Sequence, residues 1–189
     1  MYFQCLSNGS LALLGANVDL NEAWRTDNEG STDGVFHRLL PDALGKIWIV
    51  ENGALAEQSL PLIPYPFPMI DQFSDGRWLL VSSRSDGKGN ARIFNRNGEL
   101  LTRIELGDGI SHVQIDDQDR IWVGWFDEGV FGNDEWRFPG LEWPPSSAGV
   151  AAFNAGGQLL SMAKIKGIAG CYAMNVFADE VWTCTYTDF

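Results

Sequence analysis

The residues best suited to bind a ligand gather in one stretch, residues 126–149. Its aromatic members are Phe126, Phe131, Trp136, Phe138 and Trp143, and its carboxylates are Asp127, Glu128, Asp134, Glu135 and Glu142. An aromatic ring beside a carboxylate suits a sugar ring, a quaternary amine or the basic patch of a partner protein. The alternative, which is the commoner outcome for a long loop, is that these aromatics fold inward as a small satellite core.

A histidine at the start of a short alternating run could act as a general base or as a metal ligand. His112 would need a partner for either role, and Asp108 or Asp127 could supply one. His37 holds a similar place two residues after Val35, so the two histidines could share a metal, but their spacing fixes no third ligand. A structural role is the commoner one, and we predict no metal site.

Other motifs that would assign chemistry are incomplete. Asp116, Asp117 and Asp119 resemble calcium ligands but lack the continuation of an EF-hand loop. The glycine-rich residues 82–90 lack the spacing of a phosphate-binding loop, and no G-x-S-x-G occurs. We therefore predict no cofactor, although the carboxylates could hold a divalent cation.

Composition narrows the class of protein. The chain has 189 residues, a formal net charge of −12 and a pI near 4.4, which disfavours binding to nucleic acid. No apolar run is long enough to cross a bilayer, and the first residues lack the basic start of a signal peptide, so we expect a cytoplasmic protein with no membrane association. Three cysteines without C-x-x-C spacing indicate neither a disulfide framework nor a cysteine zinc site.

A repeated strand must position these residues. Four runs place a Trp two or three residues after a Gly or Asp turn, and their tryptophans are Trp48, Trp78, Trp122 and Trp182. A shorter strand precedes each run, at residues 35–40, 69–73, 111–115 and 171–177. After two of them a third and fourth strand are joined by Asn97-Gly98 and by Gly156-Gly157, which are hairpin signals in which both central positions need positive φ. Four copies at irregular spacing indicate one four-stranded unit with variable loops.

Residues 116–124, D-D-Q-D-R-I-W-V-G, resemble the blade phrase of NHL-like and two-component-regulator-type β-propellers, except that Asp119 stands where Gly is usual. The resemblance implies an all-β fold, a single β-propeller domain of four-stranded antiparallel blades. Full blades are expected at 35–63, 66–106 and 110–166. Residues 1–15 would supply strands three and four of a split blade, and residues 171–189 its strands one and two. The chain would then be either a four-bladed ring closed by its termini or a fragment of a six- or seven-bladed propeller.

In such a propeller, the resemblance implies that residues 82–90, 107–111, 126–149 and 167–170 surround the mouth of the central channel. The candidate binding residues on this face are Arg84, His112, Trp125, Asp127, Glu128, Trp136, Arg137 and Trp143.

Three functions remain open. The first is a non-catalytic module or scaffold that binds a small molecule or a protein at the channel mouth. The second is a structural part of a larger propeller, with self-association through open strand edges. The third is a metal-dependent hydrolase similar to the lactonase propellers, for which Glu51, Asn175 and Asp188 are the right residue types without a distinguishing spacing. We rank them in that order, so the sequence does not favour an enzyme.

Overall fold

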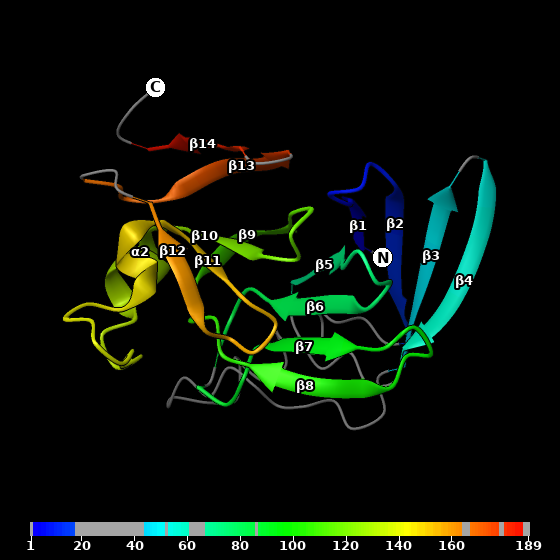
Figure 1. Cartoon of the computed structure of the whole chain (residues 1–189), viewed down its shortest axis with the longest axis horizontal. Coiled ribbons are helices and arrows are strands. Elements are labelled where there is room, and N and C mark those ends of the chain that lie inside the picture. Colours follow the sequence, from blue (N-terminus) through cyan, green and yellow to red (C-terminus); the bar gives the residue numbers. More distant parts are fainter. Residues whose placement is uncertain are drawn as a thin grey trace.

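The computed structural model of the chain describes residues 2–17, 44–51, 53–60, 67–85, 87–163, 167–177 and 180–186. The described chain is mostly β-structure, arranged as four antiparallel sheets around a common centre (Figure 1). None of the helices in these residues has the length and apolar character that a membrane span requires.

The strands follow one another in chain order within each sheet. The first sheet contains β1 (Tyr2–Cys5), β2 (Leu11–Ala16), β3 (Gly45–Glu51) and β4 (Ala54–Leu60). The second contains β5 (Pro68–Gln72), β6 (Trp78–Ser82), β7 (Ala91–Phe94) and β8 (Leu100–Ile104). The third contains β9 (Ile110–Ile115), β10 (Ile121–Trp125), β11 (Val150–Phe153) and β12 (Leu159–Met162). The fourth is the pair β13 (Cys171–Phe177) and β14 (Glu180–Thr185), and two short helices, α2 (Asp127–Gly132) and the 3₁₀ turn η1 (Pro145–Ala148), lie between β10 and β11.

The two predicted hairpins form, but with a different turn from the one expected. In each two-residue turn only the second position is left-handed, with φ of 82° at Gly98 and 77° at Gly157. A shift in strand register accompanies each turn, which is typical of a type I turn followed by a bulge. The carboxamide oxygen of Asn95 accepts hydrogen bonds from the N–H groups of Asn97 and Glu99 and so closes the first of these turns.

The same turn recurs where the first two strands of a sheet meet. Gly9 and Gly76 take the left-handed position in the first and second sheets, with φ of 83° and 81°. In the third sheet this position belongs to Asp119, with φ of 59°. The carboxylate of Asp119 accepts hydrogen bonds from the backbone N–H and the hydroxyl of Ser74 in the neighbouring turn, at 2.8 and 3.0 Å. The Asp119 side chain thus links the third sheet to the second by hydrogen bonds. A glycine at this position would relieve the backbone strain of the left-handed conformation but could not form this link.

The sheets pack face to face, because each strand alternates apolar residues toward both neighbours. One buried cluster lies between the first and second sheets and includes Leu14, Ile47, Trp78 and Phe94. A larger one lies between the second and third sheets and includes Leu79, Ile93, Val123, Trp125 and Phe153. Both faces of β6 and β7 are buried, because the second sheet lies between the first and the third.

The innermost strands β1, β5, β9 and β13 lie next to one another and are linked by side chains. The Gln4 carboxamide donates to the Val113 carbonyl and accepts from the Ile70 N–H, both at 3.1 Å, which joins β1 to β9 and β5. The Gln114 side chain accepts from the Val176 N–H at 2.7 Å, which joins β9 to β13. These contacts replace the backbone ladders that the separate sheets cannot form with each other.

Two of the expected units agree with the observed sheets, and the first does not. Strand order and pairing in 66–106 and 110–166 are as expected. However, β2 pairs with β3 along its whole length, so residues 1–15 and the Trp48 strand share one sheet instead of belonging to separate blades. The pairing is favoured by Gly15, because a Cβ there would come within 2.7 Å of the Trp48 ring. The expected strand at 35–40 lies outside the described residues.

Of the two arrangements that the resemblance left open, the ring closed by the termini is not seen among the described residues. Within the described residues β13 and β14 pair only with each other, and no strand of the first sheet joins them. Figure 1 shows the four sheets as an arc, with β13–β14 at one end and β1–β4 at the other. The observed fold is therefore a stack of antiparallel sheets curved about a common centre, without a closed ring.

Candidate functional site

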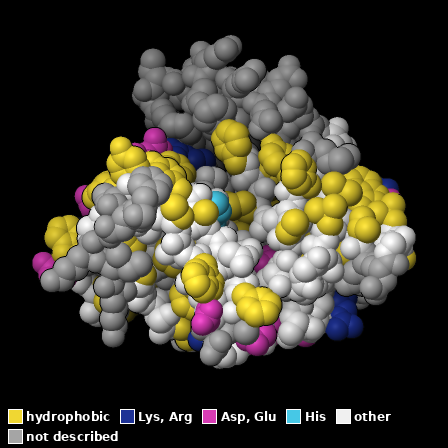
Figure 2. Space-filling model, turned by 90° about the horizontal axis from the view of Figure 1, so that it is seen from above, with side chains coloured by type: hydrophobic (Ala, Val, Ile, Leu, Met, Phe, Trp, Pro, Cys, Tyr) yellow, Lys and Arg dark blue, Asp and Glu magenta, His cyan; other side chains and the backbone are white. Residues whose placement is uncertain are grey.

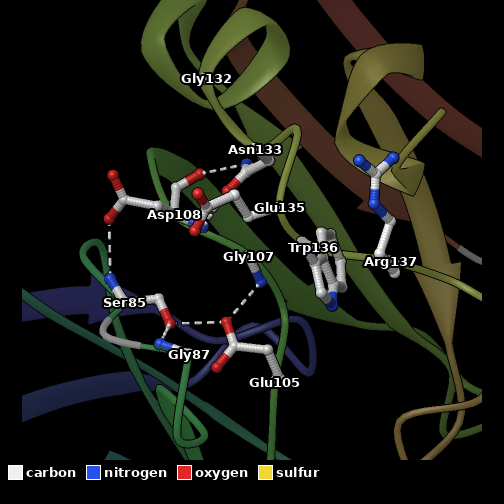
Figure 3. Close-up of a pocket in the computed structure, with 10 residues that line it drawn as sticks. All are labelled: Ser85, Gly87, Glu105, Gly107, Asp108, Gly132, Asn133, Glu135, Trp136 and Arg137. Carbon is white, nitrogen blue, oxygen red and sulfur yellow. Dashed lines mark hydrogen bonds between the residues drawn. The ribbon is translucent and has the colours of Figure 1, made fainter.

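Three of the loops expected on one face of the molecule meet around a single hollow of about 730 Å³ (Figure 3). The lining comes from the loop between β6 and β7, from the turn between β8 and β9, and from the insertion between β10 and β11. The lining residues are Ser85, Gly87, Glu105, Gly107, Asp108, Gly132, Asn133, Glu135, Trp136 and Arg137.

The insertion is held in place by one buried amide. The side chain of Asn133, which follows α2, accepts from the Asp108 N–H at 2.8 Å and donates to the Asp108 carbonyl at 2.9 Å. It also donates to the carbonyl of Gly129 and contacts the hydroxyl of Ser146 in η1. One side chain therefore satisfies the ends of three segments, so the long insertion is an ordered part of the site.

The opposite wall is fixed in the same way. The carboxylate of Glu105 accepts from the Ser85 hydroxyl at 2.6 Å and from the N–H groups of Gly89 and Gly107 at 2.8 and 2.9 Å. The buried Asn90 side chain bonds the Gly107 carbonyl and the Leu106 N–H. Glu105 is thus occupied in positioning its own wall, and its charge is not available to bind a ligand without breaking these bonds.

Trp136 forms the apolar floor of the hollow. Its ring centroid lies 6.0 to 6.2 Å from those of Trp125, Phe138 and Phe153. Gly107 is required beneath it, since a Cβ there would come within 2.7 Å of the ring and the backbone has φ of 78°. Trp136 remains half-buried, so part of its ring stays accessible from the hollow.

The insertion aromatics do not share one outcome, and Trp136 alone among them lines the hollow. Trp136 and Phe138 pack against the main core, as a satellite core would. Phe131 and Trp143 are exposed, but neither lines the hollow.

An arginine bridges two of the loops beside the hollow. The Arg84 guanidinium lies 2.5 Å from the Glu128 carboxylate and 3.5 Å from that of Asp108. Asp108 also accepts the Ser85 N–H at 2.7 Å. Arg84, Asp108 and Glu128, which lie far apart in the sequence, are thus brought together, and one guanidinium with two carboxylates leaves a formal charge of −1.

Two charged side chains in the hollow have no such neighbour. Among the described residues, the carboxylate of Glu135 and the guanidinium of Arg137 form neither a hydrogen bond nor an ion pair, and both side chains are exposed. Figure 3 shows Arg137 on the other side of the Trp136 ring from Glu135 and Asp108. The Trp136 ring therefore lies between a free carboxylate and a free guanidinium.

The remaining candidates lie elsewhere. Trp125 is fully buried and donates its indole N–H to the Leu106 carbonyl at 3.0 Å, so it supports the floor and cannot touch a ligand. Asp127 is exposed at the start of α2, where its carboxylate accepts the Glu128 N–H. Its charge is well placed for the positive end of that helix, a structural role.

His112 does not form the pair that a general base would need. Within the described residues it has no hydrogen bond or ion pair to Asp108 or Asp127 and does not line the hollow. Burial lowers the pKa of His112, while an interaction with the Tyr172 backbone opposes this shift. A neutral imidazole packed between β9 and β13 agrees with the structural role.

The described residues do not support the hypothesis of a metal-dependent hydrolase. The described residues contain no group of three His, Cys, Asp or Glu side chains that could hold a metal ion. Asn175 is exposed on β13, whereas His37, Asp188 and the side chain of Glu51 lie outside the described residues.

Ser85, Glu105 and Asn133 line the hollow but were not candidates in the sequence, and Glu135 was named only as one of the carboxylates of residues 126–149. The segments of Ser85, Asn133 and Glu135 were expected on this face and that of Glu105 was not, and nothing local distinguishes a loop Asn or Glu that fastens two loops from one that faces water. Comparison of the chain with protein-family models, with curated proteins and with solved structures gives no match. Function is therefore argued from the geometry of the hollow.

Proposed function

We propose that the chain is a non-catalytic, propeller-type binding module whose ligand occupies the hollow at Trp136. The observation that carries this proposal is the free pair Glu135 and Arg137 on either side of an accessible indole ring, within walls held by Asn133 and Glu105. Fixed walls reduce the entropy lost on binding, so even a small polar contact set can give affinity. The adjacent innermost strands support the propeller-type arrangement.

The chemistry of the lining suggests the class of ligand. A planar or aliphatic ring can stack on Trp136, and a cationic group beside it would meet Glu135 and Asp108. A carboxylate or other anionic group on the far side would meet Arg137. We infer a small polar molecule that carries a positive group, which includes quaternary amines and amino sugars.

The test is a binding screen by isothermal titration calorimetry with choline, glucosamine, glucose and free amino acids. We expect binding of one of the cationic probes, and a loss of at least about tenfold in affinity, or about 1.4 kcal/mol, in the double variant Glu135→Gln, Arg137→Gln.

Glu142→Gln is the matched control, because Glu142 is exposed on the same insertion and does not line the hollow. Absence of binding for every probe, or equal affinity of the double variant and the control, would contradict the proposal.

A further inference from the structure

Among the residues that the structure describes, two sheet faces with exposed apolar side chains lie at the two ends of the arc. The first is the face of sheet β1–β4 that points away from β5–β8, here called the leading face. The second is the face of β13–β14 that points away from β9–β12, here called the trailing face. Figure 2 looks down on the molecule from above and shows hydrophobic side chains at the left, toward β13–β14, and at the right, toward β1–β4.

The leading face is continuous across all four strands. Strand register places Leu11 opposite Val50 and Val50 opposite Leu55, and Phe3 lies on the same side. All four side chains are exposed, with 78% of Phe3 accessible. Their neighbours on the opposite side of these strands, such as Leu14 and Ile47, are fully buried against the second sheet.

The trailing face is smaller and more aromatic. Asn175 is paired with Trp182, and Phe177 with Glu180, so these four side chains point to one side of the two strands. Trp182 and Phe177 are 67% and 72% exposed. Val176, which points to the other side, is buried, and its N–H bonds Gln114 of the third sheet.

Both faces are almost free of charge, although the chain as a whole carries −12. Among the side chains that the structure describes, the leading face holds only the ion pair of Lys46 and Glu57, and the trailing face holds only Glu180. Large apolar surface combined with depletion of charge characterises the buried centre of a protein interface.

We propose that the leading face of one copy of this chain packs on the trailing face of a second copy. Within one copy, each sheet already stacks on the next by apolar contacts, from the first sheet to the second and from the second to the third. The two open faces are the beginning and the end of this stack. A second copy would continue this stack with the same kind of sheet-on-sheet contact.

Such a contact is heterologous, since different surfaces of the two copies meet. If the trailing face of the first copy and the leading face of the second copy also meet, the two copies form a closed dimer. If they do not meet, further copies can add to the stack. The net charge of −12 on each copy opposes association, and salt screens this repulsion over about 10 Å at 0.1 M ionic strength. Association should therefore increase with salt, the reverse of a contact made by opposite charges.

The experiment measures solution mass by light scattering across concentration and ionic strength, with Phe3→Glu and Trp182→Glu as the test variants. Every leading-to-trailing contact needs both faces, so we expect each variant alone to be monomeric while the wild-type chain associates. Leu160→Glu, which changes an exposed leucine of β12 outside both faces, should associate like the wild type. Near-ultraviolet circular dichroism shows that each variant is folded.

Mixing the two variants decides the mode of contact. The Phe3→Glu copy retains its trailing face and the Trp182→Glu copy retains its leading face, so an equimolar mixture should form a heterodimer through one intact contact. Persistent dimers of Phe3→Glu alone or of Trp182→Glu alone would show that like faces meet and would overturn the proposal. A wild-type monomer under all conditions would also overturn it. Neither result bears on ligand binding at Trp136, because Phe3 and Trp182 lie outside that hollow.

Discussion

At the scale of single residues, Asp119 shows how one position can serve both a turn and the packing of two sheets. Its left-handed backbone has the conformation that glycine adopts in the equivalent turns, and its carboxylate fastens Ser74 of the neighbouring turn. A residue with a Cβ costs about 1 kcal/mol or more in this conformation, which the two hydrogen bonds offset. The presence of Asp119 where the equivalent turns have glycine is thus explained by a contact in three dimensions.

This account predicts an order of stability. Asp119→Ala keeps the strained backbone and loses both hydrogen bonds, whereas Asp119→Gly loses the bonds but also relieves the strain. We expect Asp119→Ala to unfold about 1 kcal/mol more easily than Asp119→Gly in urea denaturation. Equal midpoints for the two variants would show that the left-handed conformation carries no cost here.

At the scale of elements, the short helix α2 docks so closely that its glycines are not equivalent. A Cβ on Gly129 would lie 2.6 Å from the Asp108 carbonyl oxygen and 2.9 Å from the Cβ of Trp125. A Cβ on Gly132, in the same helix, would have no atom within 4 Å. The close approach of α2 to the 107–109 turn brings the insertion, with Trp136, against Gly107 and creates one wall of the hollow.

Alanine at these two positions should therefore have opposite effects. In an open helix position Ala is favoured over Gly by up to about 1 kcal/mol, so we expect Gly132→Ala to be neutral or slightly stabilising. Gly129→Ala must displace backbone and should destabilise by about 2 kcal/mol or more, with a change in tryptophan fluorescence as the displaced insertion moves Trp136 away from Trp125 and Phe153. Thermal unfolding of the two variants, followed by fluorescence, makes the comparison. Similar melting temperatures would mean that α2 is not packed against the turn.

At the scale of the whole molecule, a buried carboxylate joins three sheets. Asp71 on β5 is inaccessible to solvent and accepts hydrogen bonds from the Ile115 N–H of β9 at 2.7 Å and from the Ser7 N–H beyond β1 at 3.2 Å. Burial raises the pKa of Asp71 to about 6, against the opposing effect of the donors around it. The contact between the sheets thus depends on a group that titrates near neutral pH.

The sign of the resulting pH dependence follows from linkage. Because the folded pKa lies above the ordinary value of 3.8, the folded state holds the proton more tightly than the unfolded state. The stability contributed by protonated Asp71 is present below pH about 4 and is lost as pH rises through about 6, by at most about 3 kcal/mol.

Urea denaturation of the wild type and of Asp71→Asn across this range isolates the contribution, since Asn cannot titrate. We expect the wild type to lose stability relative to the variant as pH rises. Parallel profiles, or a relative gain by the wild type, would show that the hydrogen bonds outweigh burial.

The sequence alone determined the local units of this protein. Alternating apolar strands, turns with a left-handed residue and the recurrent tryptophan strands are local patterns, and the strand order of the second and third sheets follows from the repetition of one four-stranded unit. The segments that meet at the hollow could also be anticipated, because the repeat places their loops on one side. Local patterns could predict these strands and turns because backbone conformation, and strand pairing across short turns, depend on residues that are close in the sequence.

Only the tertiary structure decided what pairs across long separations. The partnership of β2 with β3, the open arc, the burial of Trp125 and the fastening roles of Asn133 and Asp119 each depend on residues brought together from distant parts of the chain. An apolar strand such as β2 presents the same edge to any partner, so its sequence does not choose between them. A loop carboxylate or amide likewise acquires its role only when a specific backbone group comes within hydrogen-bonding distance, and that distance is a property of the packed fold.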